Sequence, residues 1–160
     1  MVNSYVLLGL EASPSVFSRL LDAVPEDKWD LRADPDRFTF REVYAHLADW
    51  EPVLQARLKG TLERDNFVLP NHDPGDWAIE HGYAKSNPVE SIETFRRTRA
   101  ETVALIRSMP KEAFKRVGIH PVRGHMTIAD QISAMLGHDM YHVEQVSQLL
   151  RGARVASPSL

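Results

Sequence analysis

The sequence has 160 residues, of which 43% are hydrophobic and 26% charged, and its formal net charge at pH 7 is -3. This length fits one domain with a single apolar core, and the composition excludes a disordered chain. Without a net positive charge or a run of basic residues, a nucleic-acid partner is not expected. No cysteine is present, which excludes disulfides, thiolate nucleophiles and thiolate zinc sites.

We expect no membrane-spanning segment in the early part of the chain. Its longest apolar run, residues 5–10, is far shorter than the roughly 20 residues that a membrane-spanning helix needs. No basic segment precedes this run, as one would in a secretory signal peptide. We therefore expect a cytoplasmic protein without a membrane partner.

The first predicted helix runs to about Val24, because apolar residues before it recur at the spacing of a helix face. Its start has two interpretations. Ser13 and Pro14 could form the cap and first turn, or Pro14 could lie inside a longer helix that begins near Asn3.

Three further helices open with recognisable start signals, in which a capping side chain precedes an apolar, helically spaced segment. The signals are Thr39 with Glu42, Asn87 with Pro88, and Thr127 with Asp130. The helices are expected to end near Gly60, Pro110 and Gly152.

Four helices of about 20 residues, each roughly 30 Å long, match an all-α four-helix bundle. We expect one domain over residues 1–152 and a frayed tail over residues 153–160. Residues 62–86 form a long link rich in Pro, Asp, Asn and Gly, which is typical of a crossover or of a loop that covers a site. A second irregular link, residues 110–126, contains His120, Arg123 and His125.

Three of the seven histidines are positioned by predicted helices. His138 and His142 stand four residues apart, so their imidazoles leave one helix face one turn apart and can reach one metal ion. His46 lies beside the apolar stripe of the second helix, and the edges of two such stripes can meet at a bundle seam. A pair of core-edge histidines without a metal is the alternative, because this spacing also arises by chance.

The residues around the histidines argue against two known kinds of metal site. The segment 138–142 is not HExxH, because Asp139 replaces the glutamate base, and the lack of Glu-x-x-His argues against a dinuclear carboxylate site. Asp139 projects into an apolar stripe, so it should either orient a ligand imidazole or pair with backbone or an arginine. Asp49 is interpreted as a solvated charge, with ligand orientation as the alternative.

Two motifs together resemble the DinB-like superfamily: Thr-Phe-Arg-Glu-Val-Tyr-Ala-His-Leu-Ala-Asp over residues 39–49, and the downstream pattern Gly-His-Asp-x-x-His-x-x-Gln over residues 137–145. The agreement spans nearly the whole chain, including the turn at residues 25–27 and the loop at residues 120–124. The resemblance implies an up-up-down-down four-helix bundle that usually forms homodimers. It also implies one divalent ion bound by His46, His138 and His142. Zinc or nickel is the expected ion, and iron or manganese is the alternative.

Superfamily members include thiol-dependent transferases and isomerases, and three imidazoles leave at least one open position on an ion. The leading hypothesis is a metal-dependent hydrolase or S-transferase that activates water or an external low-molecular-weight thiol. One alternative is a non-catalytic or stress-associated protein in which the ion stabilises the helical bundle. The other is an interaction module without metal. No catalytic residue is assigned. Candidate rim residues for an anionic cosubstrate are His120, Arg123 and His125, and candidate pocket walls, or packing residues, are Trp50, Trp77 and Tyr141.

Overall fold

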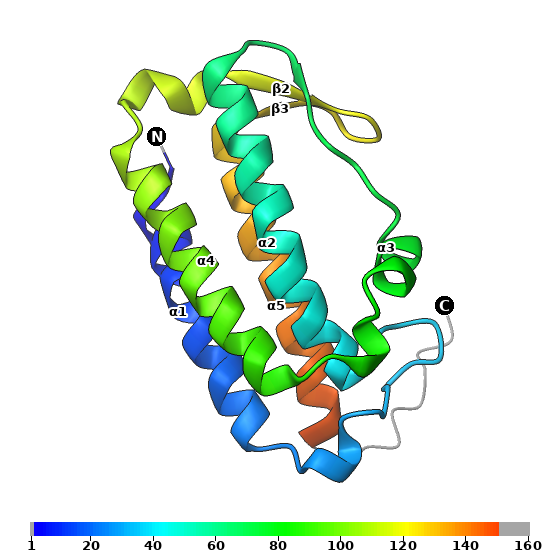
Figure 1. Cartoon of the computed structure of the whole chain (residues 1–160). Coiled ribbons are helices and arrows are strands. Elements are labelled where there is room, and N and C mark those ends of the chain that lie inside the picture. Colours follow the sequence, from blue (N-terminus) through cyan, green and yellow to red (C-terminus); the bar gives the residue numbers. More distant parts are fainter. Residues whose placement is uncertain (1, 151–160) are drawn as a thin grey trace, which may run out of the picture.

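The computed structural model describes residues 2–150. Its helices are α1 (Ser4–Asp22), α2 (Phe40–Glu63), α3 (Pro74–Glu80), α4 (Pro88–Ser108) and α5 (Ile128–Leu150). Short 3-10 helices are η1 (Glu26–Lys28), η2 (Tyr83–Lys85) and η3 (Lys111–Lys115), and the strands are β1 (Phe67–Val68), β2 (Val117–His120) and β3 (Gly124–Thr127). The four long helices form the expected four-helix bundle (Figure 1). The tail expected over residues 153–160 lies outside the described part of the chain.

The four long helices run as two parallel pairs, α1 with α5 and α2 with α4 (Figure 1). In the bundle, α4 and α5 each pack against both α1 and α2. Parallel neighbours cannot be joined by a tight turn, so the chain returns along the bundle between α2 and α4 in the long crossover that was expected (Figure 1). The directions in chain order are therefore down, up, up and down (Figure 1), which differs from the up-up-down-down order that the resemblance implied. The physical reason is that the crossover joins the second and third long helices, whereas up-up-down-down needs parallel neighbours, and so long crossovers, after the first and third helices.

The start signals act as the sequence predicts. Thr39 accepts a hydrogen bond from the Glu42 amide, and the Glu42 carboxylate accepts one from the Thr39 amide at 2.8 Å. Thr127 and Asp130 make the same reciprocal pair at the start of α5. Helix α1 is capped by Asn3 and contains Pro14, so the longer of the two alternatives for this helix is the correct one.

A polar layer divides the core between the four long helices into two apolar clusters, and a third, smaller cluster lies where α2 contacts the crossover. One cluster contains Phe17, Leu47, Phe95 and Val146, and the other contains Leu10, Leu58, Ile106 and Ile132. Each long helix contributes one buried polar residue to this layer, from a position between members of the two clusters. The four residues are Ser13, Glu51, Arg99 and Asp139. Arg99 joins them through ion pairs with both carboxylates and a hydrogen bond of 2.8 Å to the Ser13 hydroxyl.

Two elements lie in links that the sequence left irregular. Strands β1 and β2 pair in parallel, and β2 pairs with β3 in antiparallel, forming a small sheet at one end of the bundle (Figure 1). Helix α3 lies in the crossover. These elements are short, so neither carries enough period to be predicted. Among residues 2–150 no helix combines the length and apolar character that crossing a membrane requires.

Candidate metal centre

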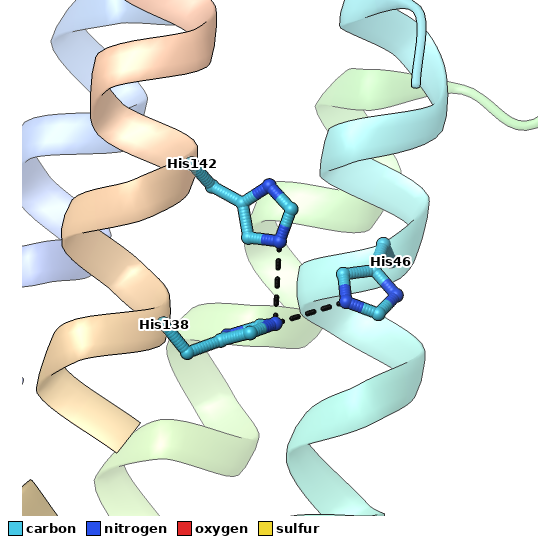
Figure 2. A group of neighbouring side chains, drawn as sticks. All are labelled: His46, His138 and His142. Carbon is cyan, nitrogen blue, oxygen red and sulfur yellow. Dashed lines mark hydrogen bonds between the residues drawn. The ribbon is translucent and has the colours of Figure 1, made fainter. Parts of the chain in front are cut away.

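The bundle brings the three predicted histidines together from two helices. His46 lies on α2, and His138 and His142 lie one turn apart on α5, so the three rings face one another across the seam between these helices (Figure 2). The Nε2 atom of His138 is 2.9 Å from Nε2 of His46 and 3.2 Å from Nε2 of His142. One ring nitrogen from each residue lies within 4.8 Å of the other two.

These separations suit three donors around one ion. Imidazole nitrogens bound at about 2.0 to 2.1 Å in tetrahedral geometry are about 3.3 Å apart. Two of the separations, 2.9 Å between His46 and His138 and 3.2 Å between His138 and His142, come close to that value. Three neutral nitrogen donors also form a set that zinc, nickel, iron and copper accept readily. The residues therefore fit a single divalent ion.

Gln145 fixes the orientation of His142. The side-chain amide nitrogen of Gln145 donates to the carbonyl of Phe38 at 2.8 Å, which turns its oxygen toward Nδ1 of His142, 3.0 Å away. An amide oxygen only accepts hydrogen bonds, so Nδ1 must carry the proton. The Nε2 atom of the neutral ring is then unprotonated and presents its lone pair to the cluster.

Burial keeps all three imidazoles neutral near pH 7. His46 and His142 are buried and His138 is partly buried between α2 and α5, and loss of hydration lowers the pKa of His46 to about 2, of His138 to about 4 and of His142 to about 3. The neighbouring imidazoles lower the pKa of His46 and His142 further, because a second positive charge in the cluster would be repelled. Neutral rings are the form that binds a metal.

Asp139 orients Arg99 rather than a histidine. It is fully buried, its carboxylate pairs with the Arg99 guanidinium at 2.5 Å, and its oxygen lies 4.0 Å from Nδ1 of His138. The arginine alternative raised from the sequence is therefore the correct one. Helical spacing already placed Arg99 on the apolar stripe of α4, between Phe95 and Val103, which is a signal that sequence reasoning missed.

Asp49 is not a solvated charge but the anchor of the crossover. Its Oδ2 atom accepts hydrogen bonds from the indole nitrogen of Trp77 and the hydroxyl of Tyr83, and lies 2.6 Å from Nδ1 of His81. These three residues belong to α3, η2 and the turn between them. Tyr83 is buried beside His46, with 6.1 Å between ring centroids, so Asp49 holds the crossover against the histidine cluster.

A cavity of about 980 Å³ opens onto the three histidines. Of the predicted wall residues, Trp50 and Tyr141 line it, whereas Trp77 lies behind Trp50 at 6.0 Å between ring centroids. Of the predicted rim residues, His120 and Arg123 line it. The prediction for His125 is wrong, because this residue lies on β3 opposite Ile119, is exposed and does not line the cavity.

Arg57 also lines the cavity, although it was not among the residues predicted for the site. The spacing of Arg57 from His46 is the sequence signal that could have identified it. Residues 46, 50, 54 and 57 follow the spacing of one helix face, so Arg57 shares the face of α2 that carries His46 and Trp50.

The fold and the site define a class: a helical bundle whose inward-facing histidines form a candidate mononuclear centre beside an open cavity. The chain belongs to the DinB superfamily, whose model matches residues 9–146. It is 22% identical to "Putative metal-dependent hydrolase YfiT" of Bacillus subtilis, over 89% of this chain and 80% of that protein. It is 23% identical to "Putative metal-dependent hydrolase OB0782" of Oceanobacillus iheyensis, over 89% of this chain and 82% of the relative.

Solved structures share the fold. The structure of YfiT, described as a probable metal-dependent hydrolase with an unusual four-helix bundle topology, is similar with a TM-score of 0.87 and 21% identity, over 93% of this chain and 86% of that one. A mycothiol-dependent maleylpyruvate isomerase is similar with a TM-score of 0.72 and 14% identity, over 89% of this chain but 60% of the isomerase. At these identities the likeness establishes the four-helix bundle and not the reaction.

Proposed function

We propose that this protein is a metal-dependent enzyme that binds one divalent ion through His46, His138 and His142 and acts on a small molecule held in the adjoining cavity. The convergence of three Nε2 atoms at the wall of that cavity carries the proposal. A bound ion would keep at least one open position and lower the pKa of a water or thiol placed there. Hydrolysis and thiol transfer are the two reactions that this chemistry supports.

The chain's own residues prepare the site for this role. Burial holds the imidazoles neutral, and Gln145 directs the lone pair of His142 toward the other two rings. Trp50 and Tyr83 lie beside His46, with ring centroids 5.2 and 6.1 Å away, and are apolar surfaces next to the cluster. The chain contains no cysteine, so a thiol nucleophile must enter from outside.

Two comparisons support an enzyme without naming its reaction. The curated relatives are described as metal-dependent hydrolases, and one structural neighbour is a mycothiol-dependent isomerase. Water and a thiol are the nucleophiles implied by these two descriptions. We therefore propose an enzyme that activates either of them, with zinc or nickel as the first ions to test.

Metal analysis of the untagged protein, reconstituted with zinc or nickel, tests the proposal. We expect one ion per chain in the wild type and in His125→Ala, a matched variant at an exposed position of strand β3, and less than a tenth of an ion in His142→Ala. Screening the loaded protein with small esters and amides, with and without a thiol cosubstrate, then separates hydrolysis from thiol transfer. Stoichiometric metal in both His142→Ala and His46→Ala would contradict the proposed site.

The competing proposal is a non-catalytic metal-binding protein whose ion stabilises the bundle. The same preparation distinguishes it from the enzyme. An ion that closes its coordination shell admits no exogenous ligand. Azide or a small thiol should change the visible spectrum of the cobalt-substituted protein if a position is open. An unchanged spectrum, together with no turnover in the screen, would contradict the enzyme and support the non-catalytic metal-binding protein.

A further inference from the structure

The cavity contains a buried arginine without an acidic partner. Arg57 is 8% exposed, its Nε donates to the carbonyl of Pro70 at 2.8 Å, and its guanidinium carbon lies 5.8 Å from the ring centroid of Trp50. No carboxylate among residues 2–150 lies within ion-pair distance of it. A buried charge is costly unless a counter-ion faces it, so this arginine is suited to an anionic ligand.

The hairpin between β2 and β3 adds two more positive or donor groups to the same cavity. Nδ1 of His120 accepts hydrogen bonds from the amides of Val122 at 3.1 Å and Arg123 at 3.3 Å, so the proton of the neutral ring lies on Nε2. His120 is 6% exposed and lines the cavity, as does Arg123. Gly124, at φ +73°, allows the turn that places both side chains there.

These groups lie near one another and near the histidine cluster. The charges of Arg57 and Arg123, after burial, lower the pKa of His120. All three groups line the cavity that His46, His138 and His142 also line.

The carboxylates that line the cavity leave this charge uncompensated. Asp36 and Asp73 are exposed, and neither forms an ion pair with Arg57 or Arg123. Oδ1 of Asp73 instead accepts hydrogen bonds from the amides of Gly75 and Asp76 at the start of α3.

We propose that Arg57, Arg123 and His120 form an oxyanion subsite that binds a carboxylate or phosphate group of a small ligand in the cavity. Guanidinium groups bind both oxyanions through paired N–H donors, and the Nε2–H of His120 supplies a further one. The subsite exists independently of a metal, but the assignment of its ligand as the enzyme's substrate rests on the proposed function.

The spacing of His46 and Arg57 on α2 limits the length of that substrate. His46 and Arg57 lie on one face of α2, and a rise of about 1.5 Å per residue places their Cα atoms about 16 Å apart along the axis. Both side chains project into the same cavity, whose wall also includes Leu54 and Leu69. The expected substrate class is therefore a small acid with an apolar or uncharged stem between its oxyanion and its reacting group.

Titration calorimetry of the metal-free protein tests the subsite without any contribution from an ion. The probes are inorganic phosphate and glutarate, each in a low-chloride buffer. We expect saturable binding of at least one probe, and binding about tenfold or more weaker in Arg57→Met and in Arg123→Met, since each removes a charged hydrogen-bond donor. Arg97→Met is the matched control, because Arg97 is exposed on α4, outside the cavity.

The outcomes separate the subsite from the proposed function. Tighter binding of phosphate or of glutarate identifies the oxyanion. Equal affinities in Arg97→Met, Arg57→Met and Arg123→Met, or no binding by the wild type, would overturn the subsite. Arg123 is exposed, so its substitution keeps the test valid if Arg57→Met fails to fold. A protein that binds anions but no metal would refute the metalloenzyme and leave the subsite standing.

Discussion

Nδ1 of His142 lies 3.0 Å from Oε1 of Gln145, one turn further along α5, and this contact selects the ring nitrogen that faces the cluster. The carbonyl of Phe38 holds the amide of Gln145 from the other side, so the amide cannot rotate without losing that bond. A side chain that touches no ion therefore determines how one candidate ligand presents itself.

Replacing Gln145 with leucine should weaken metal binding without removing a ligand. Loss of such an orienting hydrogen bond typically costs about 10- to 100-fold in metal affinity. Competition against a chelating dye gives the dissociation constant. Gln148→Leu, also on α5 but without a contact to the cluster, serves as the control and should bind zinc as the wild type does. Unchanged affinity in Gln145→Leu would show that the Gln145 amide does not fix the imidazole.

The Arg99 network should be important for stability. Arg99 is 1% exposed and pairs with Glu51 and Asp139, so Arg99→Met leaves two buried carboxylates without their shared cation. Breaking a buried pair in this way costs about 3 to 5 kcal/mol in the free energy of unfolding. Urea denaturation measures the change. Arg96→Met breaks only an exposed pair with Glu93 and should cost less than about 1 kcal/mol. Similar losses in both variants would contradict the importance of the polar layer.

The metal-free protein should lose stability in mild acid. The folded pKa values of His46, His138 and His142, about 2, 4 and 3, lie below the ordinary value of 6.5. Below about pH 6.5 the unfolded chain therefore takes up protons that the folded chain excludes. The free energy of unfolding then falls as the pH falls toward 4, by up to about 1.4 kcal/mol per pH unit for each histidine.

Urea denaturation from pH 8 to pH 5 checks this dependence on metal-free protein. The slope below pH 6.5 should be smaller in His142→Ala than in the wild type, because one excluded proton is lost. His125→Ala controls for the removal of a histidine outside the cluster. A slope that is the same in His142→Ala as in the wild type would mean that this imidazole is not kept neutral by burial.

Asp49→Ala should loosen the crossover while leaving the bundle folded. The carboxylate anchors Trp77, His81 and Tyr83, so its removal frees α3 and η2 locally. Loss of these bonds should raise hydrogen exchange in residues 74–86 about tenfold or more, while exchange in α2 and α4 stays protected. Asp76→Ala, on α3 itself, is the control. Equal exchange in the two variants would show that other contacts hold the crossover.

Local patterns in the sequence predict the helices and the spacing of residues along them. Thr39 with Glu42, and Thr127 with Asp130, fix helix starts through bonds to residues three positions away, and one helical turn separates His138 from His142. These relationships are local, so the periodicity and capping chemistry of a short segment suffice to predict them.

Which distant groups meet depends on how the helices pack in three dimensions. His46 lies 92 residues before His138, Asp139 finds Arg99 rather than an imidazole, and Arg57 meets a hairpin that carried no strand signal. Burial selects such partners, because each enclosed charge or donor must be matched by whatever the packing of other helices brings to it. That choice depends on the whole fold, and no local pattern contains it.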